Sequence, residues 1–214
     1  MEKLDYKKVY KDLYMPKTKP MLIDVPEMTF IMVDGMGDPN TCVEYKNALE
    51  ILYGLSFSIK MSKMSGHQPE GYFEYVVPPL EGFWWTAGEP FDGINVKDKN
   101  KLLWTSMIRQ PEFVTPEVFQ WAREELAKKK PEVDSKIARL VQFTEGQCAQ
   151  MMHIGSYDDE PATMKELDQF IQESSYASDL NAERKHHEIY LSDPRRTAPE
   201  KLKTVIRHPI RKQD

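Results

Sequence analysis

A glutamate lies within an apolar run near the C-terminal end of the chain, in the stretch RKHHEIYLSDPRR at 184–196. Isoleucine, tyrosine and leucine follow Glu188 directly, and an Asp-Pro pair then favours a turn, so the pattern predicts a strand. Since side chains alternate along a strand, Glu188 and Tyr190 share one face. Ile189 and Leu191 share the other face, which is expected to pack on the core. The carboxylate and the phenol are therefore expected together on the opposite face.

Three interpretations of this carboxylate stay open. On an open surface it would be a solvated strand end. In a cleft, a carboxylate beside an aromatic ring would attract a cationic or polarised ligand. Partial burial would also raise the pKa of Glu188 and make it usable as a general base.

The histidines that precede the glutamate suggest a metal site, but strand geometry argues against one. His186 and His187 are adjacent, so they point to opposite faces of the strand. Only His186 and Glu188 can converge, and the remaining candidate, His153, lies in another apolar strand. Zinc sites need three or four ligands. We therefore expect no metal, and we interpret the two histidines as a polar entry to the strand.

Other motifs of catalysis or cofactor binding are missing from the sequence. It contains no GxSxG, P-loop or GxGxxG motif. The two glycines of GMGDPN, at 35–40, lack the spacing of a phosphate-binding loop. Cys148 lies in an apolar strand, where a thiol is expected to pack rather than to react. No cofactor is predicted.

Aromatic residues supply the second part of a candidate site. Trp84 and Trp85 are adjacent in the predicted strand EGFWWTAG, so one faces the core and the other faces away. EGFWW and HEIYL occupy matching places in the two halves of the chain. A tryptophan wall is therefore expected opposite the wall formed by Glu188 and Tyr190.

Hydrophobic periodicity defines the elements that must position these residues. The expected strands span 28–38, 71–80, 81–88, 102–111, 138–146, 147–157, 186–193 and 199–210. The expected helices span 41–62, 115–130 and 162–175. Asn40 or Thr41 can cap the first helix, and Thr115, followed by Pro116, caps the second.

The two halves of the chain show the same order of elements. FIMVDGMGD in the first half and MMHIGSYDD in the second are apolar strands that end in Gly and Asp, and a helix follows each. SMIRQP, at 106–111, matches TVIRHP, at 204–209. We therefore predict an α+β fold of duplicated strand-helix-strand-strand modules with pseudo-two-fold symmetry. Antiparallel sheets would carry helices on one face, with a ligand groove between the halves.

The expected domain organisation follows from this repeat. Residues 1–26 would form an N-terminal arm and residues 27–210 a single small-molecule-binding domain. The repeats would span about 27–111 and 146–210, with the helix at about 115–130 inserted between them.

The composition limits the classes of partner. The chain has 214 residues and a formal net charge of −5, which lacks the basic footprint of a nucleic-acid-binding protein. Its two cysteines form no disulfide framework. The N-terminal segment is too charged for a signal peptide, and no apolar run reaches the roughly 18 residues of a membrane helix. We expect a soluble, cytoplasmic protein with no direct nucleic-acid or membrane partner, and a homodimer stays open.

Several stretches resemble one known family. HHEIYLSDPRRTAPEKLKTVIRHPI, HIGSYDDEPAT and LEGFWW are similar to sequences of the GyrI-like small-molecule-binding family, in particular its stand-alone bacterial members. The resemblance covers about residues 27 to 210. It implies two strand-helix-strand-strand modules with a ligand groove between them. Fused members of the family sense multidrug-like cations through an acidic pocket residue, and this chain carries no helix-turn-helix domain.

The resemblance implies three candidate functions. Some stand-alone members are hydrolases that open the cyclopropane ring of cyclopropanoid DNA-alkylating compounds, and here Glu188 would activate the water. The alternatives are a non-catalytic binder of hydrophobic, cationic or planar compounds and a gyrase-inhibitor-like interaction protein. By analogy of position, the ligand-binding candidates are Tyr190, Trp84, Trp85, Trp104, Tyr157 and Tyr75.

Overall fold

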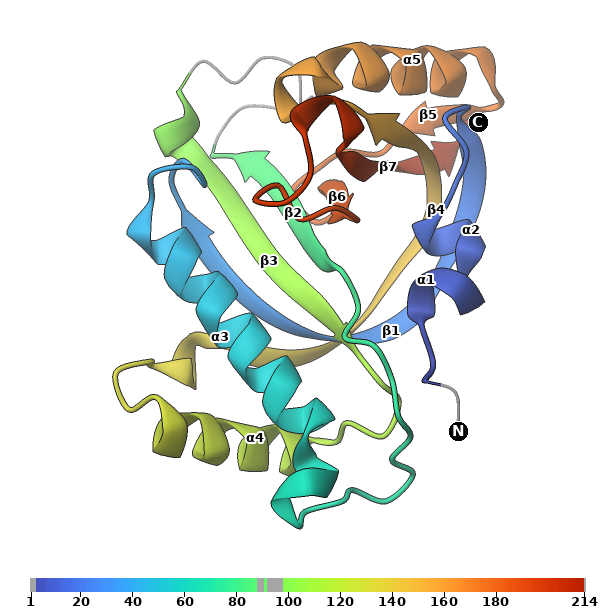
Figure 1. The fold of residues 1–214 in the computed structure, drawn as a ribbon. Helices are drawn as coiled ribbons and strands as arrows, with labels where there is room; N and C mark the ends of the chain where they lie inside the picture. Colours follow the sequence, from blue (N-terminus) through green and yellow to red (C-terminus); the bar gives the residue numbers. More distant parts are fainter. Residues whose placement is uncertain (1–2, 88–90, 92–97, 214) are drawn as a thin grey trace.

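The fold is built on one antiparallel sheet that closes on itself (Figure 1). The computed structural model describes residues 3–87, 91 and 98–213. The strand order is β4-β1-β3-β2-β6-β7-β5, and β4 also pairs with β7, which closes the sheet into a barrel-like shape. The strands are β1 (Met21–Met36), β2 (Leu80–Thr86), β3 (Leu102–Gln110), β4 (Arg139–Ile154), β5 (Tyr176–Ser178), β6 (His186–Tyr190) and β7 (Lys203–Lys212).

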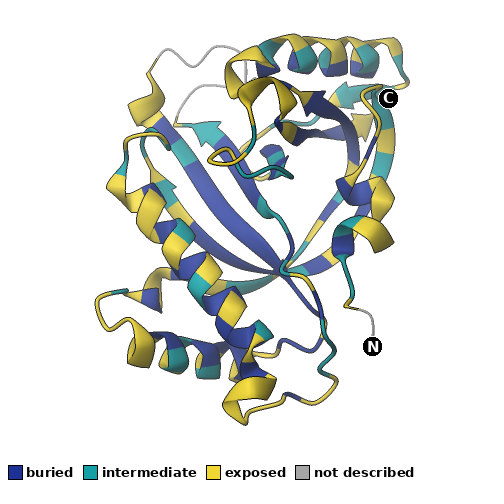
Figure 2. Cartoon of the chain, viewed as in Figure 1, coloured by how far each residue is buried: buried dark blue, intermediate teal, exposed yellow. Residues whose placement is uncertain are grey.

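The three long helices, α3, α4 and α5, lie on the outer side of this sheet. Helix α3 packs on β1 and β3, α4 packs on α3, and α5 packs on β4, β5 and β7. Each long helix exposes one side, whereas β3 is buried along almost its whole length (Figure 2). The helices are α1 (Tyr6–Val9), α2 (Lys11–Tyr14), α3 (Val43–Lys60), α4 (Pro116–Lys129) and α5 (Glu160–Glu173).

The predicted mixture of helices and antiparallel strands is confirmed, but the strands form one closed sheet instead of separate sheets. The duplication and its symmetry stay predictions.

The helix starts show how local capping decides boundaries. Helix α4 begins as predicted, because the Thr115 hydroxyl accepts a hydrogen bond from the backbone N–H of Val118 at 3.3 Å. Helix α3 instead begins after Cys42, which makes no side-chain cap. Asn40, a predicted cap, donates from its backbone and side chain to Asp38 within the preceding turn. That prediction was wrong because the turn uses the same polar side chains.

Strand β1 begins at Met21, earlier than the predicted residue 28. Pro26 lies inside this earlier part of the strand, where its missing N–H donor would be expected to interrupt a ladder. The ladder to β4 continues on both sides of it, with Val25 opposite Gly146 and Glu27 opposite Thr144. One missing donor therefore leaves the strand intact.

Strand β4 is continuous where a turn was predicted at 146–147. Gly146 adopts a positive φ of 72°, which is readily available to glycine. The Arg184 guanidinium donates to the backbone carbonyls of Glu145 at 2.7 Å and Gln147 at 2.8 Å, on either side of this glycine. Beyond it, β4 pairs with β7 as well as β1, so the predicted turn is a distortion within the closing strand.

The segment 71–80 is extended, but its predicted strand is wrong. Between residues 71 and 79 the structure assigns only an isolated bridge between Tyr75 and Leu4, and β2 begins at Leu80. Two consecutive prolines at 78 and 79 remove the donors that a ladder would need.

Four charged side chains meet inside the closed sheet. The guanidinium of Arg207 donates to Glu145 at 3.0 Å, and His187 Nδ1 lies 3.0 Å from the same carboxylate oxygen. His187 Nε2 lies 3.0 Å from Glu81. All four side chains are buried and come from β2, β4, β6 and β7, so this interior charge cluster joins strands that are not all neighbours.

The N-terminal segment is tied to the same cluster. Arg207 donates to the backbone carbonyl of Leu13 at 3.0 Å, and the Tyr14 hydroxyl donates to Glu81 at 3.3 Å. Tyr6 and Tyr14 are both about 1% exposed. The segment expected to be a polar arm therefore packs into the core. Among the described residues, the helices are all too short or too polar to cross a membrane.

We expect the Glu145→Gln substitution to lower the free energy of unfolding by about 3–5 kcal/mol, because losing one partner of a buried ion pair leaves a charge uncompensated. Chemical denaturation at neutral pH measures the change, with Glu27→Gln, at an exposed position of β1, as control. A loss no larger than that of the control would contradict the assigned role of the cluster.

The same cluster sets a dependence of stability on pH. Burial opposes ionisation of Glu145, but the charges and hydrogen bonds of His187 and Arg207 outweigh it and lower its pKa from 4.5 to about 2. Its stabilising contribution is thus complete above about pH 4.5 and is lost as the pH falls toward 2. Thermal denaturation at several pH values should show this acid loss in the wild type and a flatter acid side in Glu145→Gln.

Candidate functional site

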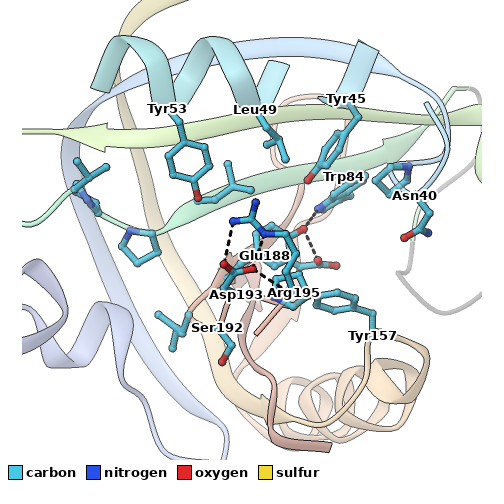
Figure 3. Close-up of a pocket in the computed structure, with 18 of the residues that line it drawn as sticks. Asn40, Tyr45, Leu49, Tyr53, Trp84, Tyr157, Glu188, Ser192, Asp193 and Arg195 are labelled. Carbon is cyan, nitrogen blue, oxygen red and sulfur yellow. Dashed lines mark hydrogen bonds and ion pairs between the residues drawn. The ribbon is translucent and has the colours of Figure 1, made fainter. Parts of the chain in front are cut away.

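A cavity of about 1120 Å³ lies between α3, strands β2 and β6, the start of α5 and the loop at 191–195 (Figure 3). It is on the face of β6 opposite the interior charge cluster, because Glu188 and His187 are adjacent in the strand. Its size suits a ligand of several fused rings. Side chains that line it include Asn40, Tyr45, Leu49, Tyr53, Trp84, Tyr157, Glu160, Glu188, Tyr190 and Arg195.

Glu188 is fixed at the base of this cavity by donors on its own strand. The Tyr190 hydroxyl donates to one carboxylate oxygen at 2.7 Å, and His186 Nε2 lies 2.8 Å from the other. The indole N–H of Trp84, on the neighbouring strand β2, donates to the Tyr190 hydroxyl at 2.8 Å. The predicted common face of Glu188 and Tyr190 is thus confirmed, and His186 belongs to it.

A glycine makes room for this arrangement. Gly82 lies directly opposite Glu188 in the ladder between β2 and β6. A Cβ atom at this position would lie 3.0 Å from the indole nitrogen of Trp84 and 3.5 Å from the Tyr190 hydroxyl. A side chain here would therefore crowd the hydrogen bond that orients Tyr190.

Behind Glu188, two histidines connect the cavity to helix α5. His186 Nδ1 lies 2.8 Å from His208 Nε2, and His208 Nδ1 lies 3.2 Å from the Asp168 carboxylate. Both histidines are fully buried, whereas the Asp168 side chain is 32% exposed. The interpretation of the histidines as a polar strand entry is therefore wrong for His186, because its ring is the link between Glu188 and a second, distant carboxylate.

The number of protons in this chain of hydrogen bonds, from Glu188 through His186 and His208 to Asp168, determines its charge. An ionised carboxylate only accepts hydrogen bonds, so three bonds between the ends Glu188 and Asp168 require three protons on four ring nitrogens. Two neutral imidazoles supply two, so one histidine carries an extra proton. Burial lowers the pKa of His208. The count thus gives one extra proton shared by the two rings between the carboxylates.

This neighbour reverses the expected charge behaviour of Glu188. Burial alone would raise the pKa of Glu188, as the sequence interpretation expected. The hydrogen bonds from His186 and Tyr190 and the positive charge of His186 outweigh burial and lower the pKa instead. Glu188 is thus a carboxylate at neutral pH.

A second carboxyl group in the cavity behaves in the opposite way. Glu160, the first residue of α5, is 4% exposed and lines the same cavity. Burial and the negative charge of Glu188 raise the pKa of Glu160 well above its ordinary value. The cavity therefore holds two carboxyl groups whose environments shift their pKa values in opposite directions.

Helix α3 supplies the wall that faces Glu188. Tyr45, Leu49 and Tyr53 are spaced four residues apart and so lie on one side of the helix, toward the cavity (Figure 3). Tyr45 lies 5.9 Å from the Trp84 ring, measured between centroids. None of these three residues is among the predicted site residues, although their spacing of four along a helix places them on one face.

Tyr157 lies across the cavity from this helix. Its ring meets the Tyr190 ring edge to face, with centroids 6.0 Å apart. Burial and the nearby carboxylates raise its pKa to about 12, so it presents a neutral phenol. At the mouth, Arg195 donates to Asp193 at 2.9 Å, which holds the predicted Asp-Pro turn in place.

The structure separates the predicted site residues into two groups. Glu188, Tyr190, Trp84 and Tyr157 line the cavity. Three others do not belong to its described lining: Trp85, Trp104 and Tyr75.

Each residue outside the cavity has another environment. Trp85 points to the opposite face of β2, where Lys185 Nζ lies 4.8 Å from its ring. Trp104 is about 1% exposed and supports Tyr45 from behind, with ring centroids 5.0 Å apart. Tyr75 is about 1% exposed and packs against Phe113.

The expected tryptophan wall opposite Glu188 is wrong. Strands β2 and β6 are hydrogen-bonded neighbours, with Trp84 paired to His186. Trp84 therefore lies beside the glutamate on the same surface. In the described part of the chain, no group of three or more His, Cys, Asp or Glu side chains is arranged to hold a metal ion.

Sequence comparison identifies the family. The model of the GyrI-like small molecule binding domain matches residues 18–211. The chain belongs to the GyrI-like family. Its domain is thus a small-molecule-binding domain, and the predicted resemblance is confirmed. No curated protein matches the chain.

Solved GyrI-like structures from Listeria innocua are similar over the whole chain. An uncharacterized conserved protein has 51% sequence identity and a TM-score of 0.92, covering 98% of this chain and 100% of that one. A structure described as a hydrolase has 49% identity and a TM-score of 0.89, with the same coverage. A second structure described as a hydrolase has 50% identity and a TM-score of 0.90, also covering 98% and 100%.

We expect the Asp168→Asn substitution to raise the pKa of Glu188, although Asp168 lies outside the cavity. The asparagine amide can donate to His208, so the chain no longer needs the extra proton that stabilises ionised Glu188. Titration of the glutamate carboxyl carbons by NMR measures the change, and Glu188→Gln assigns the signal. Glu166→Gln, exposed on the same helix, is the control for loss of a charge. Equal titration of Glu188 in both variants would contradict the proton count.

Proposed function

We propose that this GyrI-like protein is a hydrolase of planar, hydrophobic electrophiles, in which Glu188 accepts a proton from the attacking water. The observation that carries the proposal is a fixed, ionised carboxylate at the base of a cavity with aromatic walls. The similar Listeria innocua structures described as hydrolases support it.

The family resemblance suggests the class of substrate. A cyclopropane conjugated to a carbonyl group has an electrophilic ring carbon, and cyclopropanoid DNA-alkylating compounds carry this group on a flat ring system. Water oxygen would bond to the ring carbon while a carbon–carbon bond breaks and its electron pair moves to the carbonyl oxygen. The water proton would pass to Glu188. Tyr45, Tyr157 and Trp84 offer ring faces and edges to a flat substrate.

Each carboxylate oxygen of Glu188 accepts one hydrogen bond from the protein. Each oxygen therefore has a further lone pair that can accept a hydrogen bond from a water molecule. The lowered pKa makes Glu188 a weak base, so its contribution would rest on orienting the water against an already strained bond. This makes a reactive substrate a requirement of the proposal.

The same lowered pKa favours a second candidate function, binding without chemistry. A carboxylate that stays ionised beside aromatic rings suits a hydrophobic cation. The two functions share one cavity and differ in whether Glu188 exchanges a proton.

We expect Glu188→Gln to reduce ring opening of a cyclopropane-fused dienone by about 10²–10⁴-fold while changing the dissociation constant of the uncharged substrate little, because only proton acceptance is lost. Product formation and equilibrium binding are measured on the same preparations, with Glu166→Gln as control. Unchanged turnover would exclude Glu188 as the base. Two results together would favour the second function. The wild type would bind the dienone without turnover, and it would bind a hydrophobic cation for which Glu188→Gln has lost affinity.

The adjacent tryptophans give a test of where the ligand binds. Only Trp84 of the pair lines the cavity, so we expect a flat aromatic ligand to quench the fluorescence of the wild type and of Trp85→Phe alike. In Trp84→Phe the quenching should fall sharply, because the nearest indole is missing. Equal quenching in both variants would place the ligand elsewhere.

A further inference from the structure

The cavity contains a second buried carboxyl group that the proposed reaction has not yet used. Glu160 stands at the start of α5, and its Oε1 atom is buried without a hydrogen-bond partner among the described residues. Buried polar atoms in proteins are usually satisfied, and an exception calls for an explanation. Since Glu160 also lines the cavity, a ligand there can provide the missing partner.

The charged surroundings of Glu160 determine its protonation. Glu188 faces it from β6, and Asp158 lies just before it in the 3₁₀ turn Tyr157–Asp159. Both are carboxylates, and Tyr157 and Tyr190 are neutral phenols. The Thr204 hydroxyl, on β7, lies close enough to favour the charged form of Glu160, but it is uncharged and makes no hydrogen bond of good geometry with the carboxyl group.

A cation is missing from this environment. Among the ion pairs of the described residues, none involves Glu160, whereas Glu188 is paired with His186. A carboxyl group that is buried, unpaired and next to a carboxylate keeps its proton. Two carboxyl groups whose environments separate their protonation states in one cavity form the arrangement of a general acid and a general base.

We propose that Glu160 is a second catalytic residue of this cavity, the general acid that protonates the substrate atom on which the breaking bond leaves its electron pair, while Glu188 accepts the proton of the attacking water. This assignment rests on the proposed hydrolase function and deepens it.

The proposed step balances without any further reactant. A bond forms between water oxygen and the cyclopropane carbon, and one carbon–carbon bond of the ring breaks. The released electron pair moves through the conjugated system to the carbonyl oxygen, which takes the proton of Glu160. Glu188 takes one proton from water. After product release, that proton passes from Glu188 to Glu160 through water in the open cavity, which restores both groups.

The arrangement also limits the charge of the ligand. With Glu160 protonated, the cavity carries one ionised carboxylate, and His186 lies behind it. A neutral carbonyl compound gains a hydrogen-bond donor from Glu160, whereas a dication would meet one carboxylate only. The site thus favours an uncharged electrophile with an acceptor oxygen.

The test compares Glu160→Gln with Glu166→Gln, an exposed position on the same helix. Ring opening of a cyclopropane-fused dienone is followed across the pH range, and kcat and KM are obtained for each variant. We expect kcat of Glu160→Gln to fall by about 10²–10⁴-fold with KM within a few-fold, because glutamine keeps the shape and a donor but cannot give up a proton. The fall of wild-type kcat at alkaline pH should disappear in this variant.

The outcomes separate the two proposals. Turnover by Glu160→Gln at the wild-type rate, or an unchanged alkaline limb, would overturn the role of Glu160 and leave the hydrolase function standing. A wild type that binds the dienone without turnover would overturn the hydrolase function and the catalytic role together.

An infrared measurement checks the proton itself and does not depend on turnover. The wild type at neutral pH should show a carboxylic acid C=O band that is missing in Glu160→Gln and retained in Glu166→Gln. If Glu160→Gln folds poorly, Glu160→Asp serves in its place. It keeps a shorter carboxylic acid, so we expect it to retain part of the wild-type kcat. Absence of the band in the wild type would overturn the assignment.

Discussion

The pairing of His187 with two carboxylates inside the closed sheet fixes the orientation of strand β6, and the cavity depends on it. His187 is held between Glu81 and Glu145, at 3.0 Å from each. Because neighbouring residues of a strand face opposite ways, this interior anchor forces Glu188 outward. A register shift of one residue would exchange the two faces and bury the wrong carboxylate. The interior charge cluster is therefore the condition for the external site.

Two buried charged systems thus lie on either side of one strand, and they are balanced differently. The interior cluster combines Arg207 and His187 with two carboxylates, so it can be neutral overall and contribute to stability. The cavity side keeps a net negative charge, because two imidazole rings, His186 beside Glu188 and His208 beside Asp168, share one extra proton between two carboxylates. Glu160 remains protonated because a further negative charge in the same space would be unfavourable. The difference separates a structural cluster from a site that can react with a ligand.

Local patterns in the sequence were sufficient for the elements whose causes are local. Thr115 and Pro116 define the start of α4, and alternation alone gives the common face of Glu188 and Tyr190. The predicted strand boundaries that were wrong lie at residues that are compatible with either a turn or a strand. Pro26 in β1 and Gly146 in β4 are both typical of turns, yet both lie inside long strands. The pairing of β1 with β4, and of β4 with β7, extends over many residues and outweighs the local preference.

The remainder of the site depends on contacts that no local pattern encodes. Trp84 and Tyr190 are 106 residues apart, and His186 and His208 are 22 apart, so their hydrogen bonds exist only after the sheet has closed. The ring of His186 that lowers the pKa of Glu188 is in turn connected through His208 to Asp168, which lies on helix α5. A carboxylate in an apolar run suggests a raised pKa, but the closed sheet brings His186 and Tyr190 into hydrogen-bond contact with Glu188, and its pKa is lowered instead. The chemistry of the residue therefore follows from the topology of the sheet more than from its place in the sequence.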